Sequence, residues 1–439
     1  MDGASYGQHS AGATQQRKPP AVTKPGECGS TGATPADDPD REDELMLERA
    51  KFLLQPSTRG AVPPFIVMDV MAAAARLEAQ GRRIIHMEVG QPAAAAPATA
   101  IAAARAALPS GPLGYTEALG IPSLRRRIAR AYGEWHGVDL DPARVVVTTG
   151  SSAGFMLAFL AAFEVGDRVA MAVPGYPPYR HILSALGCEP IGIETAASTR
   201  WSITGEALLA QHRVRDLKGL ILASPANPTG TMMTAAALAE LIRCAEDAGI
   251  AVISDEIYHG LDYAFAAETA ARISSDVIVI NSFSKYFCMT GWRVGWMVVP
   301  PALVRTVERL QQNLAISVPT LSQIAAEAAF DGRPELEEVR HGYEDNRRIL
   351  LDGLPGAGLD TFLPVDGAFY LYADVSRFST DSFTFATRML EEAGVAATPG
   401  IDFDPVHGKD FLRLCYAGAR AEMREAVDRI GDWLRKGTL

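Results

Sequence analysis

The sequence predicts an α/β fold with a mostly parallel sheet in a large domain, followed by a smaller α+β domain. Between residues 144 and 318, short β-branched runs alternate with helical stretches, which is typical of a parallel sheet covered on both faces. After residue 319 the alternation gives way to long helical segments and isolated strand-like runs. The length of 439 residues allows two or three domains of ordinary size.

Composition narrows the function classes. Hydrophobic residues make up 48% and charged residues 21%, which is ordinary for a soluble globular protein. The net charge of −11 opposes attraction to phosphate backbones, so we expect no nucleic-acid partner. The five cysteines form no C-x-x-C pair, which favours reduced thiols in a cytoplasmic protein over a disulfide framework or a metal site: Cys28, Cys188, Cys244, Cys288 and Cys415.

Neither a signal peptide nor a membrane span is expected. The N-terminus lacks a charged stretch followed by an apolar run. Residues 145–163 carry no charge over nearly the length of a bilayer span, but a polar Thr-Thr-Gly-Ser-Ser sequence interrupts them. This segment is better interpreted as a buried strand, a turn and a helix, so we expect no membrane partner.

The chain divides into four predicted parts. Residues 1–44 are rich in small and polar residues and predict a disordered tail. Residues 45–92 predict an N-terminal arm and part of the small domain, with a helix at 67–80 and a strand at 83–87. Residues 93–318 predict the large domain, and residues 319–439 the small domain.

The predicted elements place polar segments at strand ends. In the large domain we expect strands at 145–148, 169–173, 220–222, 251–254, 277–280 and 296–299, and helices at 152–163, 234–248 and 301–314. In the small domain we expect helices at 321–330, 334–350 and 420–436, and strands at 368–372 and 411–415. Ligands of parallel sheets bind at the carboxyl ends of the strands, so polar residues there are the candidates for a site.

The sharpest of these signals is Ser-Phe-Ser-Lys at 282–285. It follows the strand at 277–280, so Lys285 points toward the predicted crevice, and Arg293 comes eight residues later. A desolvated lysine beside another cation has a lowered pKa and becomes nucleophilic. Such a lysine could hold an anionic aldehyde cofactor; the structural alternative is a surface lysine in a loop.

Two further segments follow neighbouring strands. Asp255 and Tyr258 come after the strand at 251–254; the carboxylate could pair with a protonated heterocycle nitrogen, and Tyr258 could donate to a phenolic oxygen. The alternative for Asp255 is a helix N-cap. Asn227, in Asn-Pro-Thr-Gly, follows the strand at 220–222 and could equally belong to a turn.

A fourth segment, Thr-Gly-Ser-Ser at 149–152, opens a helix after a strand. Helix N-terminal amides and two hydroxyls suit a phosphate group. The patterns GxxxxGK[ST] and GxGxxG do not occur at this segment, so neither a P-loop nor a dinucleotide site is predicted. Each of the four segments alone could be structural.

In combination, these segments resemble fold-type I pyridoxal-phosphate enzymes, specifically the class I aminotransferase family. The resemblance covers roughly residues 58–435. It implies that Lys285 forms the Schiff base with pyridoxal 5'-phosphate and then moves the proton at Cα. It also implies that Asp255 pairs with the ring nitrogen, and that Tyr258 and Asn227 donate to the phenolic oxygen.

The resemblance assigns the remaining site residues as well. The phosphate contacts it implies are Ser151, Ser152, Ala153, Ser282 and Arg293, although Ala153 stands near a place where many members carry Lys or Thr. Tyr176 takes the place of the aromatic that stacks on the ring. Arg413 matches the arginine that binds the substrate α-carboxylate, with Gly90 and Asn227 beside it. Tyr115 is similar to the tyrosine that reaches the phosphate of a neighbouring subunit, which implies a homodimer with shared sites.

We therefore expect a cytoplasmic aminotransferase that moves an amino group between an amino acid and a 2-oxo acid. A lyase or synthase acting at the β- or γ-position of an amino acid is the alternative, because it would use the same cofactor residues. A regulator that binds the cofactor without turnover would need a binding module, which residues 1–44 do not offer. The segments 62–66 and 313–320 carry no cation for a side-chain carboxylate, so we expect neutral or apolar amino donors to be preferred over aspartate.

Overall fold

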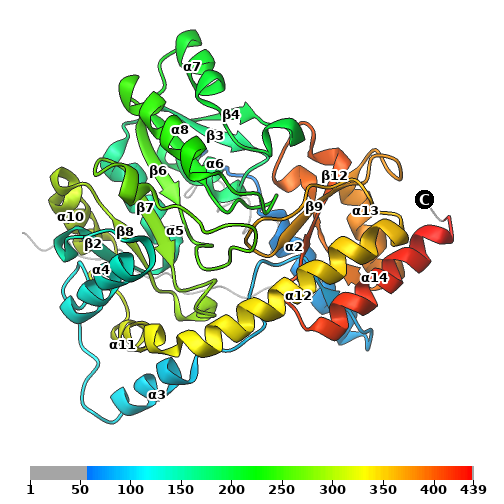
Figure 1. Ribbon diagram of the computed structural model, residues 1–439, viewed down its shortest axis with the longest axis horizontal. Helices are drawn as coiled ribbons and strands as arrows, with labels where there is room; N and C mark the ends of the chain where they lie inside the picture. Colours follow the sequence, from blue (N-terminus) through cyan, green and yellow to red (C-terminus); the bar gives the residue numbers. More distant parts are fainter. Residues whose placement is uncertain (1–56, 438–439) are drawn as a thin grey trace, which may run out of the picture. The chain divides into compact units, whose positions relative to one another are not determined.

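A seven-stranded sheet organises the described part of the chain, residues 57–437 of the computed structural model (Figure 1). Its strands, in spatial order, are β2 (Val145–Thr148), β8 (Gly295–Val298), β7 (Ile278–Ser282), β6 (Ala251–Asp255), β5 (Gly219–Ala223), β3 (Arg168–Val173) and β4 (Glu189–Glu194). Only β8 runs antiparallel to its neighbours in this sheet. The predicted α/β fold with a mostly parallel sheet is confirmed.

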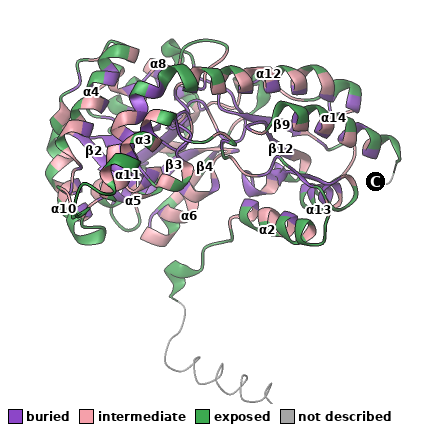
Figure 2. Cartoon of the chain, turned by 90° about the horizontal axis from the view of Figure 1, so that it is seen from below, coloured by how far each residue is buried: buried purple, intermediate pink, exposed green. Residues whose placement is uncertain are grey.

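Helices cover both faces of this sheet, and successive strand residues pack to opposite sides. One face packs against α5 (Gly150–Ala162), α6 (Pro177–Leu186) and α10 (Val304–Leu314), the other against α4 (Pro122–His136) and α8 (Ala235–Asp247). Val146 joins the apolar cluster of the first face, whereas Val145 and Val147 join that of the second. Figure 2 shows the buried strands between helices whose outer surfaces are exposed.

The strand β4 (Glu189–Glu194) was not predicted. It pairs only with β3 at the edge of the sheet, and its sequence contains Pro190, Gly192 and two glutamates. An edge strand needs neither a continuous apolar run nor strong strand formers, so its sequence carries little periodic signal. The strands that were predicted in the large domain all lie within a few residues of their observed bounds.

Two smaller sheets bring the N- and C-terminal parts together. The strand β12 (Phe411–Cys415) lies between β11 (Thr398–Pro399) and β9 (Tyr370–Asp374), and β1 (Ile85–His86) pairs in parallel with β10 (Val395–Ala396). The predicted domain boundaries at 92/93 and 318/319 stay predictions. The predicted tail, residues 1–44, and the start of the N-terminal arm, 45–56, lie outside the described residues.

The remaining helices frame these sheets. They are α2 (Ile66–Ala79), α3 (Ala98–Ala107), α7 (Gly205–Val214), α9 (Ala270–Ile273), α11 (Thr320–Ala329), α12 (Arg333–Ala357), α13 (Ser382–Arg388) and α14 (Arg420–Arg435). The helix predicted at 334–350 continues as α12 to Ala357, and Figure 1 shows α14 alongside its C-terminal half. Within residues 57–437 no helix is long and apolar enough to cross a membrane.

Candidate active site

A cavity of about 220 Å³ lies where β5, β6 and β7 end. Most of the predicted site residues line it: Gly90, Ser151, Ser152, Tyr176, Asn227, Tyr258, Lys285, Arg293 and Arg413. Asp255 and Ser282 are buried beside it, whereas Ala153 and Tyr115 are not among its lining residues. The structure thus brings together four strand-end segments that lie far apart in the sequence.

Lys285 follows β7 by three residues, as predicted from the strand-end position of its motif. Its Nζ donates to the carbonyl oxygen of Gly90 at 2.6 Å and lies 5.8 Å from the centroid of the Tyr258 ring. Burial, together with the nearby charges of Arg413 and Arg293, lowers the pKa of Lys285 to about 8, although Cys415 and Asp255 oppose the shift. A larger fraction of the amine is therefore uncharged and nucleophilic near neutral pH than for an exposed lysine.

Asp255 is the last residue of β6 and is buried. Its Oδ2 accepts a hydrogen bond from the hydroxyl of Tyr179, and its Oδ1 accepts one from the amide of Ile257 at 3.1 Å. Burial raises the pKa of Asp255 to about 6, although both hydrogen bonds oppose the rise. Asp255 therefore makes a hydrogen bond within its own turn and also lies beside the cavity.

Tyr179 was not identified from the sequence. It lies three residues after Tyr176 on α6, so both side chains lie on one side of the helix, and their ring centroids are 5.2 Å apart. The paired tyrosines after Pro-Gly were a usable signal, but nothing in the sequence indicated that Asp255 would be the partner of the second one. The structure adds Tyr179 as the residue that orients this carboxylate.

The N-terminus of α5 and Arg293 form a site for an anion. No side-chain cap from Thr149 occupies the first amides of α5, and Ser151 and Ser152 line the cavity. Gly150 has φ 73°, and a Cβ atom there would overlap the Arg293 guanidinium. Free helix N-terminal amides, two hydroxyls and a guanidinium are the donors that a phosphate group requires.

Ser282 contributes to this region indirectly. Its hydroxyl donates to Ser284 Oγ at 2.9 Å, and it is Ser284 that lines the cavity, together with Thr290. Arg293 donates to the carbonyl oxygen of Thr290 at 3.0 Å. Ser284 and Thr290, which sequence reasoning had not named as site residues, thus belong to the lining of this cavity.

Arg413 lies at the centre of β12 and is 2% exposed. Its guanidinium donates to Asn227 Oδ1 at 2.9 Å, to Thr398 Oγ1 at 3.1 Å and to the carbonyl oxygen of Glu88. The rings of Tyr370 and Phe403 lie 4.5 and 4.7 Å from it. Its Nε has no hydrogen-bond partner within the described part of the chain, so this rigid fork retains a free donor.

Tyr370 is a second residue that the sequence did not reveal. Its hydroxyl lies 2.8 Å from that of Tyr258, and a Cβ atom at Gly90 would overlap it. Gly90 is therefore required for the backbone to approach this hydroxyl. A strand was predicted at 368–372, close to the observed β9 (Tyr370–Asp374), but no pattern within it singled out Tyr370.

These groups fit a phosphorylated pyridine aldehyde. A nucleophilic amine, a buried carboxylate for a ring nitrogen, aromatic rings and a cluster of anion donors all surround one cavity. A sequence profile described as "Aminotransferase class I and II" matches residues 82–430, well over half of the chain. The chain belongs to the class I and II aminotransferase family.

Individual aminotransferases are similar over almost their whole length. The chain is 49% identical to the valine–pyruvate aminotransferase of Mycobacterium tuberculosis, over 86% of this chain and 97% of that protein. It is 30% identical to the aspartate aminotransferase of Geobacillus stearothermophilus, over 84% and 96% of the two chains. This chain is a pyridoxal-phosphate-dependent aminotransferase.

Solved structures agree. A crystal structure of an aminotransferase from Mycobacterium tuberculosis aligns with a TM-score of 0.85 at 48% identity, covering 87% of this chain and all of that one. The aspartate aminotransferase of Thermus thermophilus aligns with a TM-score of 0.81 at 30% identity, again over 87% of this chain and all of the other. These relatives support amino-group transfer between an amino acid and a 2-oxo acid over the lyase or synthase alternative.

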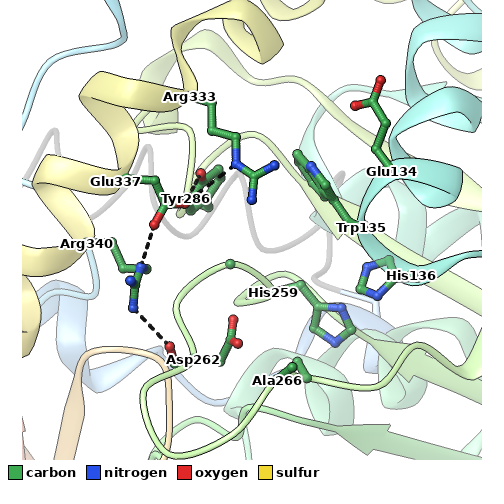
Figure 3. A pocket seen from close by; sticks show the side chains of 12 residues that line it. Glu134, Trp135, His136, His259, Asp262, Ala266, Tyr286, Arg333, Glu337 and Arg340 are labelled. Atoms are coloured by element: carbon green, nitrogen blue, oxygen red, sulfur yellow. Dashed lines mark hydrogen bonds and ion pairs between the residues drawn. The ribbon is translucent and has the colours of Figure 1, made fainter.

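A second cavity of the aminotransferase, about 350 Å³, lies apart from these residues (Figure 3). Its lining includes His136, His259 and the α12 residues Arg333, Glu337 and Arg340. Its charges pair among themselves: Glu337 accepts from Tyr286 at 2.7 Å and from Arg340 at 2.8 Å. This lining of mixed and mutually paired charges contrasts with the first cavity, whose lining cations Lys285, Arg293 and Arg413 form no ion pair with a carboxylate within the described residues.

Proposed function

We propose that Lys285, Asp255 and Tyr258 are the catalytic residues of this aminotransferase. Bound in the first cavity, pyridoxal phosphate supplies an electrophilic aldehyde for an amine and a ring that withdraws electrons from the substrate Cα. The buried Lys285 amine would hold the cofactor through its aldehyde group, and it would be the base placed to take the proton from the substrate Cα and return it. Its lowered pKa suits both tasks, because an uncharged amine is the nucleophile and the base.

Other residues would orient the cofactor and stabilise its charged groups. Asp255, oriented by Tyr179, would keep a proton on the ring nitrogen, and Tyr176 would pack against the ring. Tyr258 and the amide nitrogen of Asn227 donate to the phenolic oxygen; Asn227 has this nitrogen free because its oxygen accepts from Arg413. Phosphate is held by Arg293, Ser151, Ser152 and the amides that open α5, with Ser282 acting through Ser284.

The substrate α-carboxylate binds Arg413. The stacked rings of Tyr370 and Phe403 and the fixed partners of the guanidinium support this role, because they hold a planar bidentate donor without using its Nε. The backbone of Gly90 lies next to the same space, since its carbonyl oxygen accepts from Lys285.

We propose that the preferred amino donors carry neutral or apolar side chains. The cavity lining beyond the cofactor residues is largely apolar and includes Phe65, Val67, Met68 and Ile182. The cations among its lining residues are Lys285, Arg293 and Arg413, and each has a role in cofactor or α-carboxylate binding. A side-chain carboxylate would therefore be desolvated without a partner, which is unfavourable. This lining is the observation that carries the proposal.

Arg180, which lies between the lining residues Pro178 and Ile182 in sequence, does not alter this conclusion. Arg180 of α6 donates to the backbone oxygen of Asp402 at 2.5 Å, and the charges of Asp402 and Asp404 act on it. It is not among the residues that line the cavity. A relative at 49% identity is a valine–pyruvate aminotransferase, which agrees with an apolar donor.

We also propose a homodimer in which Tyr115 reaches the phosphate site of the partner subunit. Tyr115 is 82% exposed, and Leu113, Leu314 and Ile316 are exposed as well. Thr320 donates to the carbonyl oxygen of Gly114 at 2.5 Å, so the loops around 113–116 and 314–320 lie side by side. Exposed aromatic and aliphatic side chains gathered on adjoining loops are typical of a subunit interface.

The cytoplasm is the proposed location. The cysteines of the described part of the chain, Cys188, Cys244, Cys288 and Cys415, are all free thiols, which suits a reducing compartment. Amino-acid and 2-oxo-acid substrates of an aminotransferase are available there.

The donor preference is tested by comparing kcat/KM for valine, leucine, alanine, phenylalanine, aspartate and glutamate with one 2-oxo acid. We expect the best apolar donor to exceed aspartate by at least about tenfold, the effect of roughly 1.4 kcal/mol for an unpaired buried charge. Half-reaction spectra with each amino acid alone would separate transamination from other chemistry. A clear preference for aspartate would show that a cation reaches the pocket from elsewhere, and the proposed donor class would be wrong.

A further inference from the structure

The helix α2 (Ile66–Ala79) begins without a cap from its own segment. Its N-cap residue, Phe65, makes no side-chain hydrogen bond to the first turn. Instead, the amides of Ile66 and Val67 donate to Oδ1 and Oδ2 of Asp402, both at 3.3 Å. The first amides of a helix lack intrahelical partners and favour a negative charge, so one carboxylate from the other end of the chain supplies what the local sequence lacks.

Asp402 is itself fixed by neighbouring elements. It is 1% exposed and closes the short helix η8 (Gly400–Asp402), directly after β11, the strand that pairs with Arg413. Its backbone oxygen accepts from Arg180 of α6, the helix that has Tyr176 as its N-cap residue and Tyr179 in its first turn. Asp402 thus connects the first turn of α2 to two elements that bear residues of the active site.

The residues that this connection holds form the apolar part of the cavity. Phe65, Val67 and Met68 line it, and the Phe65 ring meets the Tyr176 ring edge-to-face at 5.8 Å. Met68 is 48% exposed, so these three residues form a rim of the cavity that borders solvent. Without the two bonds to Asp402, the first turn of α2 would have only its side-chain contacts to keep it against Tyr176.

We propose that Asp402 is a positioning residue for donor specificity: by capping α2 across the fold, it holds Phe65 and Val67 against the side chain of the bound amino acid. This rests on the proposed preference for apolar donors. Asp402 is not among the residues that line the cavity, and it acts on the donor side chain through the first turn of α2. Its charge also acts on Arg413 and Arg180, an effect that all amino donors share because each carries the α-carboxylate.

Two variants and a matched control separate positioning from general stability. Asp402→Asn keeps the volume and one acceptor, and Asp402→Ala removes both. Thr204→Ala removes a similar single cap from α7, since the exposed Thr204 accepts from the amide of Ala207 at 3.2 Å and does not line the cavity. All are made in the full-length, cofactor-loaded enzyme.

Hydrogen exchange tests the cap directly. In Asp402→Asn, and more strongly in Asp402→Ala, the amides of residues 66–68 should exchange at least about fivefold faster, as loss of a cap worth about 1 kcal/mol or more implies. The cofactor absorbance should remain that of the parent, and Thr204→Ala should leave residues 66–68 unchanged. Parent-like exchange at residues 66–68 in both Asp402 variants would overturn the cap.

Kinetics tests the link to specificity. The Asp402 variants should raise KM for valine and leucine several-fold more than KM for alanine, whose side chain does not reach the rim, with smaller changes in kcat. In Phe65→Ala the further substitution Asp402→Asn should raise KM for valine less than it does in the parent, because part of the Asp402 effect acts through Phe65. Equal losses for valine and alanine, or fully additive losses with Phe65→Ala, would overturn the specificity role.

This design distinguishes failure of the inference from failure of the proposed function. If the parent enzyme preferred aspartate, the proposed donor class would be wrong, and the exchange data would still decide whether Asp402 holds α2. If the parent preferred valine but the valine-to-alanine ratio were the same in the parent and both Asp402 variants, the donor class would stand and the role of Asp402 in it would fall.

Discussion

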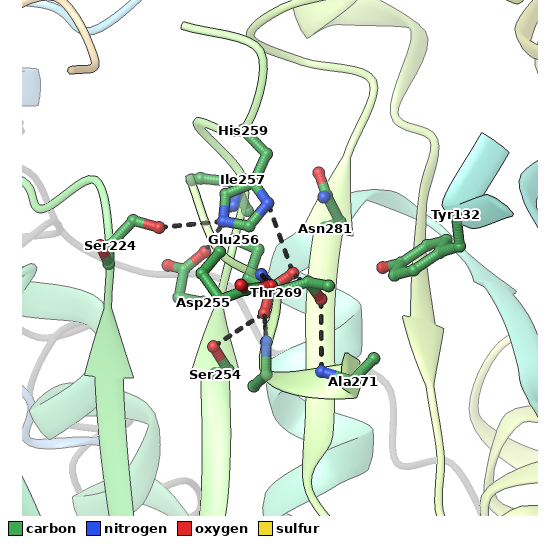
Figure 4. A network of polar contacts seen from close by, with 12 residues as sticks. Tyr132, Ser224, Ser254, Asp255, Glu256, Ile257, His259, Thr269, Ala271 and Asn281 are labelled. Carbon is green, nitrogen blue, oxygen red and sulfur yellow. Dashed lines mark hydrogen bonds and ion pairs between the residues drawn. The ribbon is translucent and has the colours of Figure 1, made fainter. Parts of the chain in front are cut away.

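Asp255 and Glu256 are adjacent carboxylates at the end of β6, and the structure gives them different surroundings. Asp255 accepts from the Tyr179 hydroxyl and from one amide of its own turn. Glu256 accepts from Ser254 Oγ at 3.1 Å, from Thr269 Oγ1 at 2.8 Å and from the amide of Ala270 at 2.7 Å (Figure 4). Both are buried, and burial raises the pKa of Asp255 to about 6 and that of Glu256 to about 7.

The difference lies in unused acceptor capacity. A carboxylate offers about four lone-pair sites, of which Glu256 uses three for fixed donors that join β6 to α9. Glu256 also lies near His259, whose Nδ1 is 3.5 Å away and whose ring is 5.5 Å from that of His136. Asp255 uses two sites and lies beside the cavity near Lys285. Glu256 therefore suits a structural task, and Asp255 a task that involves a ligand.

We expect the largest effect from removing Lys285, which lines the cavity beside Asp255. Lys285→Ala should abolish borohydride trapping of the cofactor on the protein and lower turnover by at least about 10²–10⁴-fold, the range for loss of a positioned base. Mass spectrometry of the reduced protein and steady-state kinetics measure the two effects. The control, Lys218→Ala, changes an exposed lysine just before β5 and should behave as the parent. Normal turnover in Lys285→Ala would remove the basis for placing the reaction in this cavity.

The next effect separates the two carboxylates. Asp255→Ala should keep the cofactor bound but lose most exchange of the Cα proton, by on the order of a hundredfold or more, because no group would hold the ring-nitrogen proton. Deuterium exchange at Cα, followed by NMR, is the measurement, and Asp255→Glu should lose less. Parent-like exchange in Asp255→Ala would mean that Asp255 is as structural as its neighbour.

A third prediction extends the comparison to a second subunit. If Tyr115 completes the partner's site, mixing inactive Tyr115→Phe and Lys285→Ala proteins should restore activity, because hybrid dimers carry one intact site. The restored fraction should follow the amount of hybrid found by native mass spectrometry. Hybrids without any activity would show that each site is built from one chain.

Sequence reasoning was strongest where the chemistry is local. Lys285, Asp255 and Asn227 each follow a predicted strand, and the rule that strand ends of a parallel sheet share one edge brought them together correctly. The fold class was also predicted correctly, because buried parallel strands appear in the sequence as continuous apolar runs. Motif order then connected these residues to one family.

The residues that were missed depend on contacts between distant segments. The local sequence around Tyr179, Tyr370 and Asp402 is not distinctive. The role of each depends on a hydrogen-bond partner at least 70 residues away in sequence. Periodicity reports which face of an element is buried, not what it meets there. The edge strand β4 escaped because its pattern is set by exposure on one side rather than by burial on both.

The smallest expected effect tests the structural carboxylate through pH. The pKa of Glu256 rises from 4.5 in the unfolded chain to about 7 in the folded protein, because it is buried. Between these values the folded state keeps a proton that the unfolded state releases, so Glu256 makes the protein less stable as pH rises. Each pH unit in this window corresponds to about 1.4 kcal/mol. Burial lowers the pKa of His136 and His259 to about 4. These histidines therefore destabilise the folded protein at acidic pH, below about pH 6.5, where the unfolded chain binds protons that the folded protein does not.

Glu256→Gln mimics the protonated carboxyl and should remove the Glu256 contribution while leaving both histidines in place. Relative to the parent, its free energy of unfolding should increase by about 2–3 kcal/mol between pH 5 and pH 8, measured by urea titration of the cofactor-free protein. Glu206→Gln, on the exposed surface of α7, should show no such trend. Turnover of Glu256→Gln should stay within a few-fold of the parent, in contrast to Asp255→Ala. A flat difference between Glu256→Gln and the parent across this pH range, or a hundredfold loss of turnover, would contradict the distinction between the two carboxylates.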